Sequence, residues 1–141
     1  DASIEDINPE ELDMVVLPGG LDGVEKLKSD RKVYELLKAV REKGKYISAI
    51  CAAPTALASF GLLEGKRSTV YPELKEQIKP ALFVDEKVVE DSKIITSQGP
   101  GTAFAFGLRL VEKLVGRNKA REVAKRMLID WNDTGESKAQ S

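Results

Sequence analysis

Residues 46–57 read YISAICAAPTAL, an apolar run followed by small residues that suit the start of a helix. A continuous apolar run bounded by turn-forming residues is typical of a parallel β-strand that is buried on both faces. We expect this strand at 46–50 and a helix at 55–60, which Gly61 would end. Cys51 then lies at the junction between them. A strand, a turn and a helix in succession form the repeating unit of an α/β fold.

The rest of the chain continues this alternation of strands and helices. Apolar runs between turn residues predict strands, and apolar residues at helical spacing predict helices. The other predicted strands are residues 12–17, 68–71 and 93–97, with a small hairpin of 82–84 and 87–89. The other predicted helices are a segment from an N-cap at Ser29 or Asp30 to a stop at Gly44, residues 73–78 after Pro72, residues 102–115 capped by Thr102, and residues 118–127 capped by Asn118. We therefore expect a mostly parallel sheet that is covered by helices on both faces.

The composition bounds the size of the domain and excludes several kinds of site. With 141 residues the chain is long enough for one domain, which we expect over residues 1–131, followed by a flexible polar tail at 132–141. The chain has no histidine and one cysteine. It therefore cannot build a Ser-His-Asp triad, a Cys-His pair, a His-ligated metal site or an internal disulfide.

Charge and hydropathy narrow the range of partners. Lys and Arg number 22 and Asp and Glu number 23, and the resulting net charge of −1 argues against a large basic surface for nucleic acid or anionic membranes. No apolar run approaches the roughly 20 residues that a transmembrane helix needs. A single free cysteine suits a reducing compartment. We therefore expect a cytoplasmic protein that binds neither nucleic acid nor membrane.

Three segments rich in Gly, Pro or Ala follow predicted strands. In open α/β sheets, ligands bind beyond the carboxyl ends of the strands, and small residues there permit tight turns and close approach of a ligand. We expect these segments to meet at one edge of the sheet and to form the functional site. They are Pro18-Gly19-Gly20, Cys51-Ala52-Ala53-Pro54 and Gln98-Gly99-Pro100-Gly101.

Cys51 is the candidate nucleophile of that site. Its small neighbours Ala49, Ala52 and Ala53 would permit the sharp strand-to-helix turn of a nucleophile elbow. The amides and the positive dipole end of the helix that follows would favour a thiolate, and the N–H groups of Ala52 and Gly20 could stabilise an oxyanion. The alternative is that Cys51 is a small buried apolar residue, and the residues alone leave both interpretations open.

These motifs taken together resemble those of the ThiJ/PfpI superfamily and, within it, the branch of the Parkinson-disease protein deglycase. The matching runs are Leu17-Pro18-Gly19-Gly20, Ala49-Ile50-Cys51-Ala52-Ala53-Pro54-Thr55-Ala56-Leu57 and Thr96-Ser97-Gln98-Gly99-Pro100-Gly101-Thr102-Ala103-Phe104. The resemblance implies a flavodoxin-like three-layer sandwich, a homodimer and no cofactor. It also implies that Cys51 is the reactive cysteine, that Gly20 and Ala52 supply oxyanion-hole amides, and that Gly19, Tyr71, Gly99 and Pro100 line the substrate pocket.

Two residues depart from the family pattern. The protease branch has a histidine directly after the reactive cysteine, where this chain has Ala52, so we do not expect protease activity. The deglycase branch often has a histidine where this chain has Tyr71. This leaves Tyr71 either as a hydrogen-bond donor to the substrate or as a half-buried aromatic residue.

Members of the family also carry a segment before the one that matches Asp1. That segment includes a central strand of the sheet and a glutamate that hydrogen-bonds the reactive cysteine. We therefore expect the sheet of this chain to lack its N-terminal strand or strands, which would leave backbone groups unpaired. A second polypeptide, or a segment outside this chain, is expected to supply the strands and the carboxylate.

Two functions are compatible with these residues. The leading hypothesis is a cofactor-independent glyoxalase or deglycase that acts on methylglyoxal-like dicarbonyls or their early adducts, with Cys51 attacking the aldehyde carbon. The alternative is a redox sensor or stress chaperone without turnover, whose accessible thiol oxidises to a sulfinate that the helix start stabilises. Both hypotheses rest on the same sequence features, so the sequence does not separate them.

Overall fold

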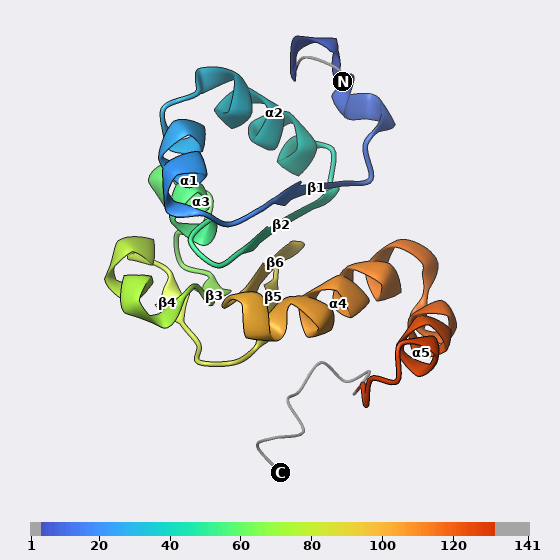
Figure 1. The fold of residues 1–141 in the computed structure, drawn as a ribbon. Coiled ribbons are helices and arrows are strands. Elements are labelled where there is room, and N and C mark those ends of the chain that lie inside the picture. Colours follow the sequence, from blue (N-terminus) through green and yellow to red (C-terminus); the bar gives the residue numbers. More distant parts are fainter. Residues whose placement is uncertain (1–3, 132–141) are drawn as a thin grey trace.

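A four-stranded sheet with the strand order β1-β2-β6-β5 forms the centre of the computed structural model, which describes residues 4–131 (Figure 1). The strands are β1 (Met14–Leu17), β2 (Tyr46–Ile50), β5 (Val88–Asp91) and β6 (Ile94–Ser97). β1, β2 and β6 run parallel, and β5 is antiparallel to β6. The carboxyl ends of the three parallel strands therefore meet at one edge, which is where such sheets bind ligands. The expected α/β fold with a mostly parallel sheet is confirmed.

Helices cover both faces of the sheet (Figure 1). α1 (Leu21–Lys28), α2 (Arg31–Glu42) and α3 (Pro54–Ser59) lie on one face, and α4 (Ala103–Val115) lies on the other and packs against α5 (Arg117–Arg126). Four short 3-10 helices lie in the described connections, namely η1 (Ile4–Asp6), η2 (Pro9–Glu11), η3 (Pro72–Ile78) and η4 (Pro100–Thr102). Within residues 4–131, no helix combines the length and the apolar character that a membrane span requires.

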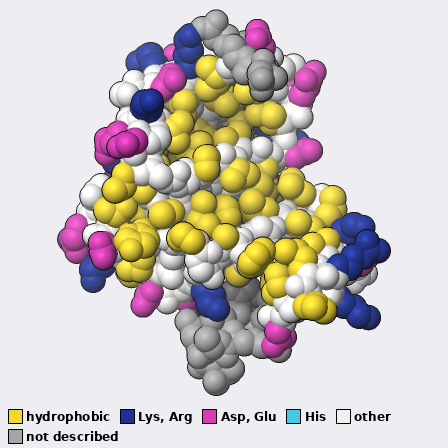
Figure 2. All heavy atoms as spheres, viewed as in Figure 1, with side chains coloured by type: hydrophobic (Ala, Val, Ile, Leu, Met, Phe, Trp, Pro, Cys, Tyr) yellow, Lys and Arg dark blue, Asp and Glu magenta, His cyan; other side chains and the backbone are white. Residues whose placement is uncertain are grey.

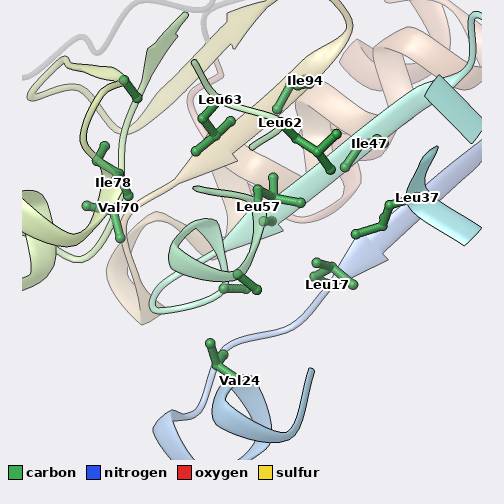
Figure 3. Close-up of a cluster of buried hydrophobic side chains, with 14 of the residues drawn as sticks. Leu17, Val24, Leu37, Ile47, Leu57, Leu62, Leu63, Val70, Ile78 and Ile94 are labelled. Carbon is green, nitrogen blue, oxygen red and sulfur yellow. The ribbon is translucent and has the colours of Figure 1, made fainter. Parts of the chain in front are cut away.

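The two faces of the sheet are unequally buried. The larger core lies between the sheet and α1–α3, where side chains such as Leu37 and Ile47 are almost completely removed from water (Figure 3). The smaller core, under α4, is centred on Val88, Ile95 and Phe106. Since each fully buried aliphatic side chain stabilises the fold by roughly 1.5–3 kcal/mol, the first core supplies most of the apolar stabilisation.

β1 is an edge strand that is covered on one side only. Its one partner among the described residues is β2, so its other edge presents unpaired backbone N–H and C=O groups. Val15 and Leu17 pack into the larger core, and Val16, which alternation turns to the opposite face, is 46% exposed. Figure 2 shows apolar side chains gathered across the middle of the face drawn there, and Phe104 at the start of α4 is 63% exposed. One edge and one face of the sheet are thus incompletely covered within residues 4–131.

The predicted hairpin of residues 82–84 with 87–89 is wrong. β4 (Leu82–Phe83) pairs in parallel with β3 (Arg67–Ser68) in a separate two-stranded sheet, and β5 forms its hairpin with β6 instead. The physical reason is the turn at Ser92-Lys93, where both residues have positive φ angles of 54° and 65°. Two successive left-handed residues make the tight turn whose twist matches that of an antiparallel pair.

The strand predicted at 68–71 is shorter than expected and lies outside the main sheet. Beyond β3 the backbone N–H of Thr69 donates to the side-chain Oγ1 of Thr96 (2.9 Å) instead of extending a strand ladder. The N–H of Arg67 donates to the Asp91 carboxylate (2.9 Å), which joins the two sheets. This hydrogen bond holds the pKa of Asp91 below its ordinary value.

The first two α-helices differ from the sequence-based prediction in one helix that was not predicted and in the choice of an N-cap. α1 is absent from the predicted helices, because Gly23 in its interior weakens the helical pattern. Of the two candidate N-caps of α2, Asp30 caps the helix and Ser29 does not. The Asp30 side chain accepts a hydrogen bond of 2.9 Å from the N–H of Lys32, which satisfies one of the free amides of the first turn.

The caps of the last two helices differ from expectation. Thr102 is the N-cap residue of α4 as expected, but its hydroxyl hydrogen-bonds the N–H and C=O of Gly99 and makes no capping hydrogen bond to the helix. α5 follows Gly116 directly, so Asn118 lies inside the first turn of α5 and is not its N-cap. The tail expected at 132–141 lies outside the described residues.

Candidate functional site

Cys51 lies in a strained turn between β2 and α3. Its φ of 65° is in the left-handed region, which costs a residue with a side chain roughly 1–2 kcal/mol. Two hydrogen bonds hold the turn: the N–H of Cys51 donates to the C=O of Ser97 in β6 (3.1 Å), and its C=O accepts from the N–H of Tyr71 (2.9 Å). The small residues Ala52 and Ala53 follow it and are buried. The chain therefore makes the sharp turn expected of a nucleophile elbow, with a free and partly exposed thiol.

The loop after β1 packs directly against this cysteine. A Cβ atom placed on Gly19 would lie 2.6 Å from the Cys51 Cβ and 3.4 Å from its Sγ, so any other residue would force the loop or the cysteine to move. Gly20, the next residue, has a φ of 109° and is the N-cap of α1. Glycine adopts this conformation without strain. Gly19 thus allows the backbone to approach the sulfur closely, and Gly20 allows the chain to change direction at the start of α1.

Among the described residues, two backbone N–H groups beside the cysteine have no hydrogen-bond acceptor. In the part of the chain that the structure describes, neither the N–H of Gly20 nor that of Ala52 donates to an acceptor. Both residues line the same cavity as Cys51. An oxyanion hole requires free donors next to the nucleophile, because they stabilise the negative charge that develops on the attacked carbonyl oxygen. The oxyanion role of the two amides stays a prediction that this arrangement favours.

The cavity in front of Cys51 has a volume of about 440 Å³. Its walls are mainly apolar and include the side chains of Leu21 and Leu74 and the ring of Tyr71, which is 40% exposed. Glu73 is the one charged residue among those that line it. A cavity of this size, with apolar walls and a few polar groups, suits a small organic molecule.

The residues predicted to line the pocket divide into two groups. Gly20, Ala52 and Tyr71 line the cavity together with Cys51, whereas Gly19, Gly99 and Pro100 do not. Gly19 lies against Cys51, as described above. Gly99 lies against Tyr71, since a Cβ atom placed on it would be 3.6 Å from the Tyr71 Cδ1. These two glycines therefore contact residues that line the cavity.

Three lining residues, Leu21, Glu73 and Leu74, are absent from the sequence-based prediction. The two leucines lie in helical segments whose apolar spacing assigns them to no particular site. Glu73 follows Tyr71 by two residues at the start of a predicted helix, but this position alone does not indicate which surface it faces. Within residues 4–131, Cys, Asp and Glu side chains nowhere form a group of three that could hold a metal ion.

Comparisons with known proteins extend these observations. A family model described as the DJ-1/PfpI family matches residues 1–113. The fruit fly (Drosophila melanogaster) protein dj-1beta is 44% identical over 134 residues, which cover 94% of this chain and 72% of the fly protein. A second fly protein, DJ-1alpha, is 48% identical over 131 residues, which cover 91% of this chain and 60% of that protein. A Caenorhabditis elegans protein named glutathione-independent glyoxalase DJR-1.2 is 35% identical over 131 residues, covering 92% of this chain and 69% of the worm protein.

Solved structures show the same fold. The crystal structure of Drosophila melanogaster DJ-1beta matches with a TM-score of 0.86 and 43% identity, over 90% of this chain and 69% of the fly chain. A structure described as Toxoplasma gondii DJ-1, oxidized, matches with a TM-score of 0.80 and 33% identity, over 86% of this chain and 67% of that chain. The flavodoxin-like fold that the resemblance implies is confirmed. The chain spans between 60% and 72% of the length of these relatives.

Proposed function

Because the chain belongs to the DJ-1/PfpI family, we propose that it uses Cys51 to convert small reactive dicarbonyls such as methylglyoxal, or their early adducts, without a cofactor. The observation that carries this proposal is the strained turn that places the chain's one thiol in a cavity, beside two amides that have no acceptor among residues 4–131. The worm relative named as a glutathione-independent glyoxalase supports the same chemistry.

The proposed reaction begins with attack of the Cys51 thiolate on the aldehyde carbon of methylglyoxal. A C–S bond forms, the carbonyl π electrons move onto oxygen, and the Gly20 and Ala52 N–H groups stabilise that oxyanion until it is protonated to a hemithioacetal. A base then moves the proton of the former aldehyde carbon to the neighbouring ketone carbon, and the hemithioacetal hydroxyl proton passes to the ketone oxygen. The product is the thioester of lactate with Cys51. Water then hydrolyses the thioester to lactate and restores the thiol, so the sum is methylglyoxal plus water to lactate.

The proton transfer needs a base, and the family resemblance implies a carboxylate for it. We expect this carboxylate to come from a polypeptide segment that packs on the incompletely covered side of the sheet. Two observations favour such a segment: the free edge of β1 and the exposed apolar side chains Val16 and Phe104. The segment would add a strand to β1 and cover part of the face drawn in Figure 2.

Native mass spectrometry with N-terminal sequencing tests this assembly. The expected result is a complex heavier than one copy of the chain, which contains a second N-terminal sequence. A homodimer of this chain with no second sequence, or a stable folded monomer, would contradict it.

The test of the function uses the single cysteine of the chain. The purified protein is incubated with methylglyoxal in the absence of glutathione, and lactate formation is measured before and after alkylation with iodoacetamide. One alkyl group per chain, confirmed by intact mass, should reduce turnover to the background rate. Turnover that persists in fully alkylated protein would refute the proposal.

A second function is favoured by the relative whose structure is described as oxidized. Peroxide would oxidise the Cys51 thiolate in two steps, first to a sulfenate and then to a sulfinate, with one water released from each peroxide consumed. The free Gly20 and Ala52 amides could hold the sulfinate oxygens. If the same protein forms a sulfinate at low peroxide but makes no lactate, the sensor function replaces the enzymatic one.

A further inference from the structure

We propose that the cavity at Cys51 selects its ligands by charge, and that Glu73 is the residue that excludes anionic carbonyl compounds. The inference names a substrate class for the proposed function and rests on it: neutral or cationic carbonyl compounds. The observation behind it is the lining of the cavity, where Glu73 is the one charged residue and the remaining side chains are apolar, aromatic or small.

The backbone segment that carries Glu73 is tied to Cys51 by hydrogen bonds. The C=O of Cys51 accepts a hydrogen bond from the N–H of Tyr71 (2.9 Å), and the C=O of Tyr71 accepts one from the N–H of Leu74 (2.8 Å). Glu73 lies between these two anchored residues, in the first turn of η3. Its carboxylate is therefore carried by a segment that is tied to the nucleophile.

The Glu73 carboxylate is exposed and has no direct partner among the described residues, and the cation Lys75 follows it by two residues in η3. Glu73 makes no hydrogen bond or ion pair in the part of the chain that the structure covers. Lys79, the residue directly after η3, is paired with Glu76, and this hydrogen bond holds the pKa of Glu76 below its ordinary value. The net charge of the whole chain is −1, so no strong overall field of this chain competes with the charge of Glu73.

The Glu73 carboxylate repels anionic ligands and attracts cationic ones electrostatically. A negative charge beside the cavity lowers the local concentration of anions near the sulfur and raises that of cations. Because Glu73 is exposed, water and salt screen part of this effect. The site should therefore favour neutral dicarbonyls and adducts that carry a guanidinium or ammonium group. It should disfavour carbonyl compounds that carry a carboxylate or a phosphate.

Alkylation of Cys51 by a neutral and an anionic reagent tests this without requiring turnover. Iodoacetamide and iodoacetate react in the same way: the S–C bond forms, the C–I bond breaks and iodide leaves. Any change in the reactivity of the thiol itself affects both rates and cancels in their ratio. The chain has one cysteine, so intact mass reports on this site alone.

The variants are Glu73→Gln, which removes the charge, and Glu73→Lys, which reverses it. The ratio of the iodoacetamide rate to the iodoacetate rate should fall about threefold to sixfold in Glu73→Gln and further in Glu73→Lys. In the unaltered protein the ratio should also fall as salt is raised, because counterions screen the carboxylate. The matched control is Glu76→Gln on the same 3-10 helix, whose residue is paired with Lys79 and does not line the cavity.

An unchanged ratio in both Glu73 variants, with melting temperatures like that of the unaltered protein, would overturn the charge selection. An equal fall in Glu76→Gln would also overturn it, since the effect would then come from the general surface charge. The proposed function fails by a different result, the absence of lactate formation. The alkylation ratio is measured in either case, so the two failures are distinguishable.

Discussion

Cys51→Ser is expected to lower methylglyoxal turnover by at least about 10³-fold, although it replaces one sulfur atom by oxygen. A hydroxyl is a far weaker acid than a thiol, and serine nucleophiles therefore depend on an adjacent base, most often a histidine. This chain has no histidine that could take that role. The measurement is the initial rate of lactate formation, with Cys51→Ala as the variant that lacks any nucleophile.

The control for this loss is Ser59→Ala. Ser59 lies at the end of α3, exposed, and its hydroxyl bonds the C=O of Ala56 within the helix. It does not line the cavity, so this variant should keep the full rate. Thermal melting of each variant separates a catalytic loss from unfolding. A Cys51→Ser variant that keeps more than about a tenth of the rate would exclude the thiol as the nucleophile.

Gly19→Ala is expected to lower turnover by about 10²-fold, although Gly19 does not line the cavity. The added Cβ would lie 2.6 Å from the Cys51 Cβ, well inside van der Waals contact, so either the loop after β1 or the cysteine must move. A displacement of about 1 Å at a reacting group is enough for a loss of this size. Steady-state rates and the rate of alkylation by iodoacetamide both measure the displacement.

Gly23→Ala is the matched control, because Gly23 follows four residues later in α1 and a Cβ there meets no atom within 4 Å. This variant should keep the rate and become slightly more stable, since alanine favours a helix over glycine by about 1 kcal/mol. Equal rates for Gly19→Ala and the unaltered protein would show that the loop adapts without moving the sulfur.

The sequence predicts the fold well where a local pattern decides the structure. The apolar run at 46–50 coincides with β2, and the small residues around Cys51 predict the turn that its φ of 65° shows. The hairpin prediction fails because strand pairing is a long-range property. Residues 82–84 are apolar enough for a strand, but nothing in them says that their partner is β3. The turn at Ser92-Lys93 lacks the Asn-Gly signature by which such turns are identified.

In the candidate site too, residues in a local motif could be predicted from the sequence, and residues brought in by long-range contacts could not. Cys51 and the glycines are marked by their motifs, whereas Glu73 enters the cavity because two backbone hydrogen bonds fold its segment back onto Cys51. No pattern of neighbouring residues encodes that contact. Some predicted residues line the cavity, and two glycines contact those residues from outside it. Which residue does which depends on distances between loops that follow different strands, and these distances are not encoded locally.

The edge position of β1 has a mechanical consequence for the chemistry. Gly19 and Gly20 lie in the loop after β1, and among the described residues β1 is hydrogen-bonded to a neighbouring strand on one side only. One side of the site therefore depends on the position of an edge strand. The opposite wall, at Cys51, is braced by β6 through Ser97 and by the Tyr71 segment. A strand that pairs with the outer edge of β1 would restrict the motion of the loop after β1. It would thereby orient the Gly20 N–H toward the substrate without contacting the substrate itself.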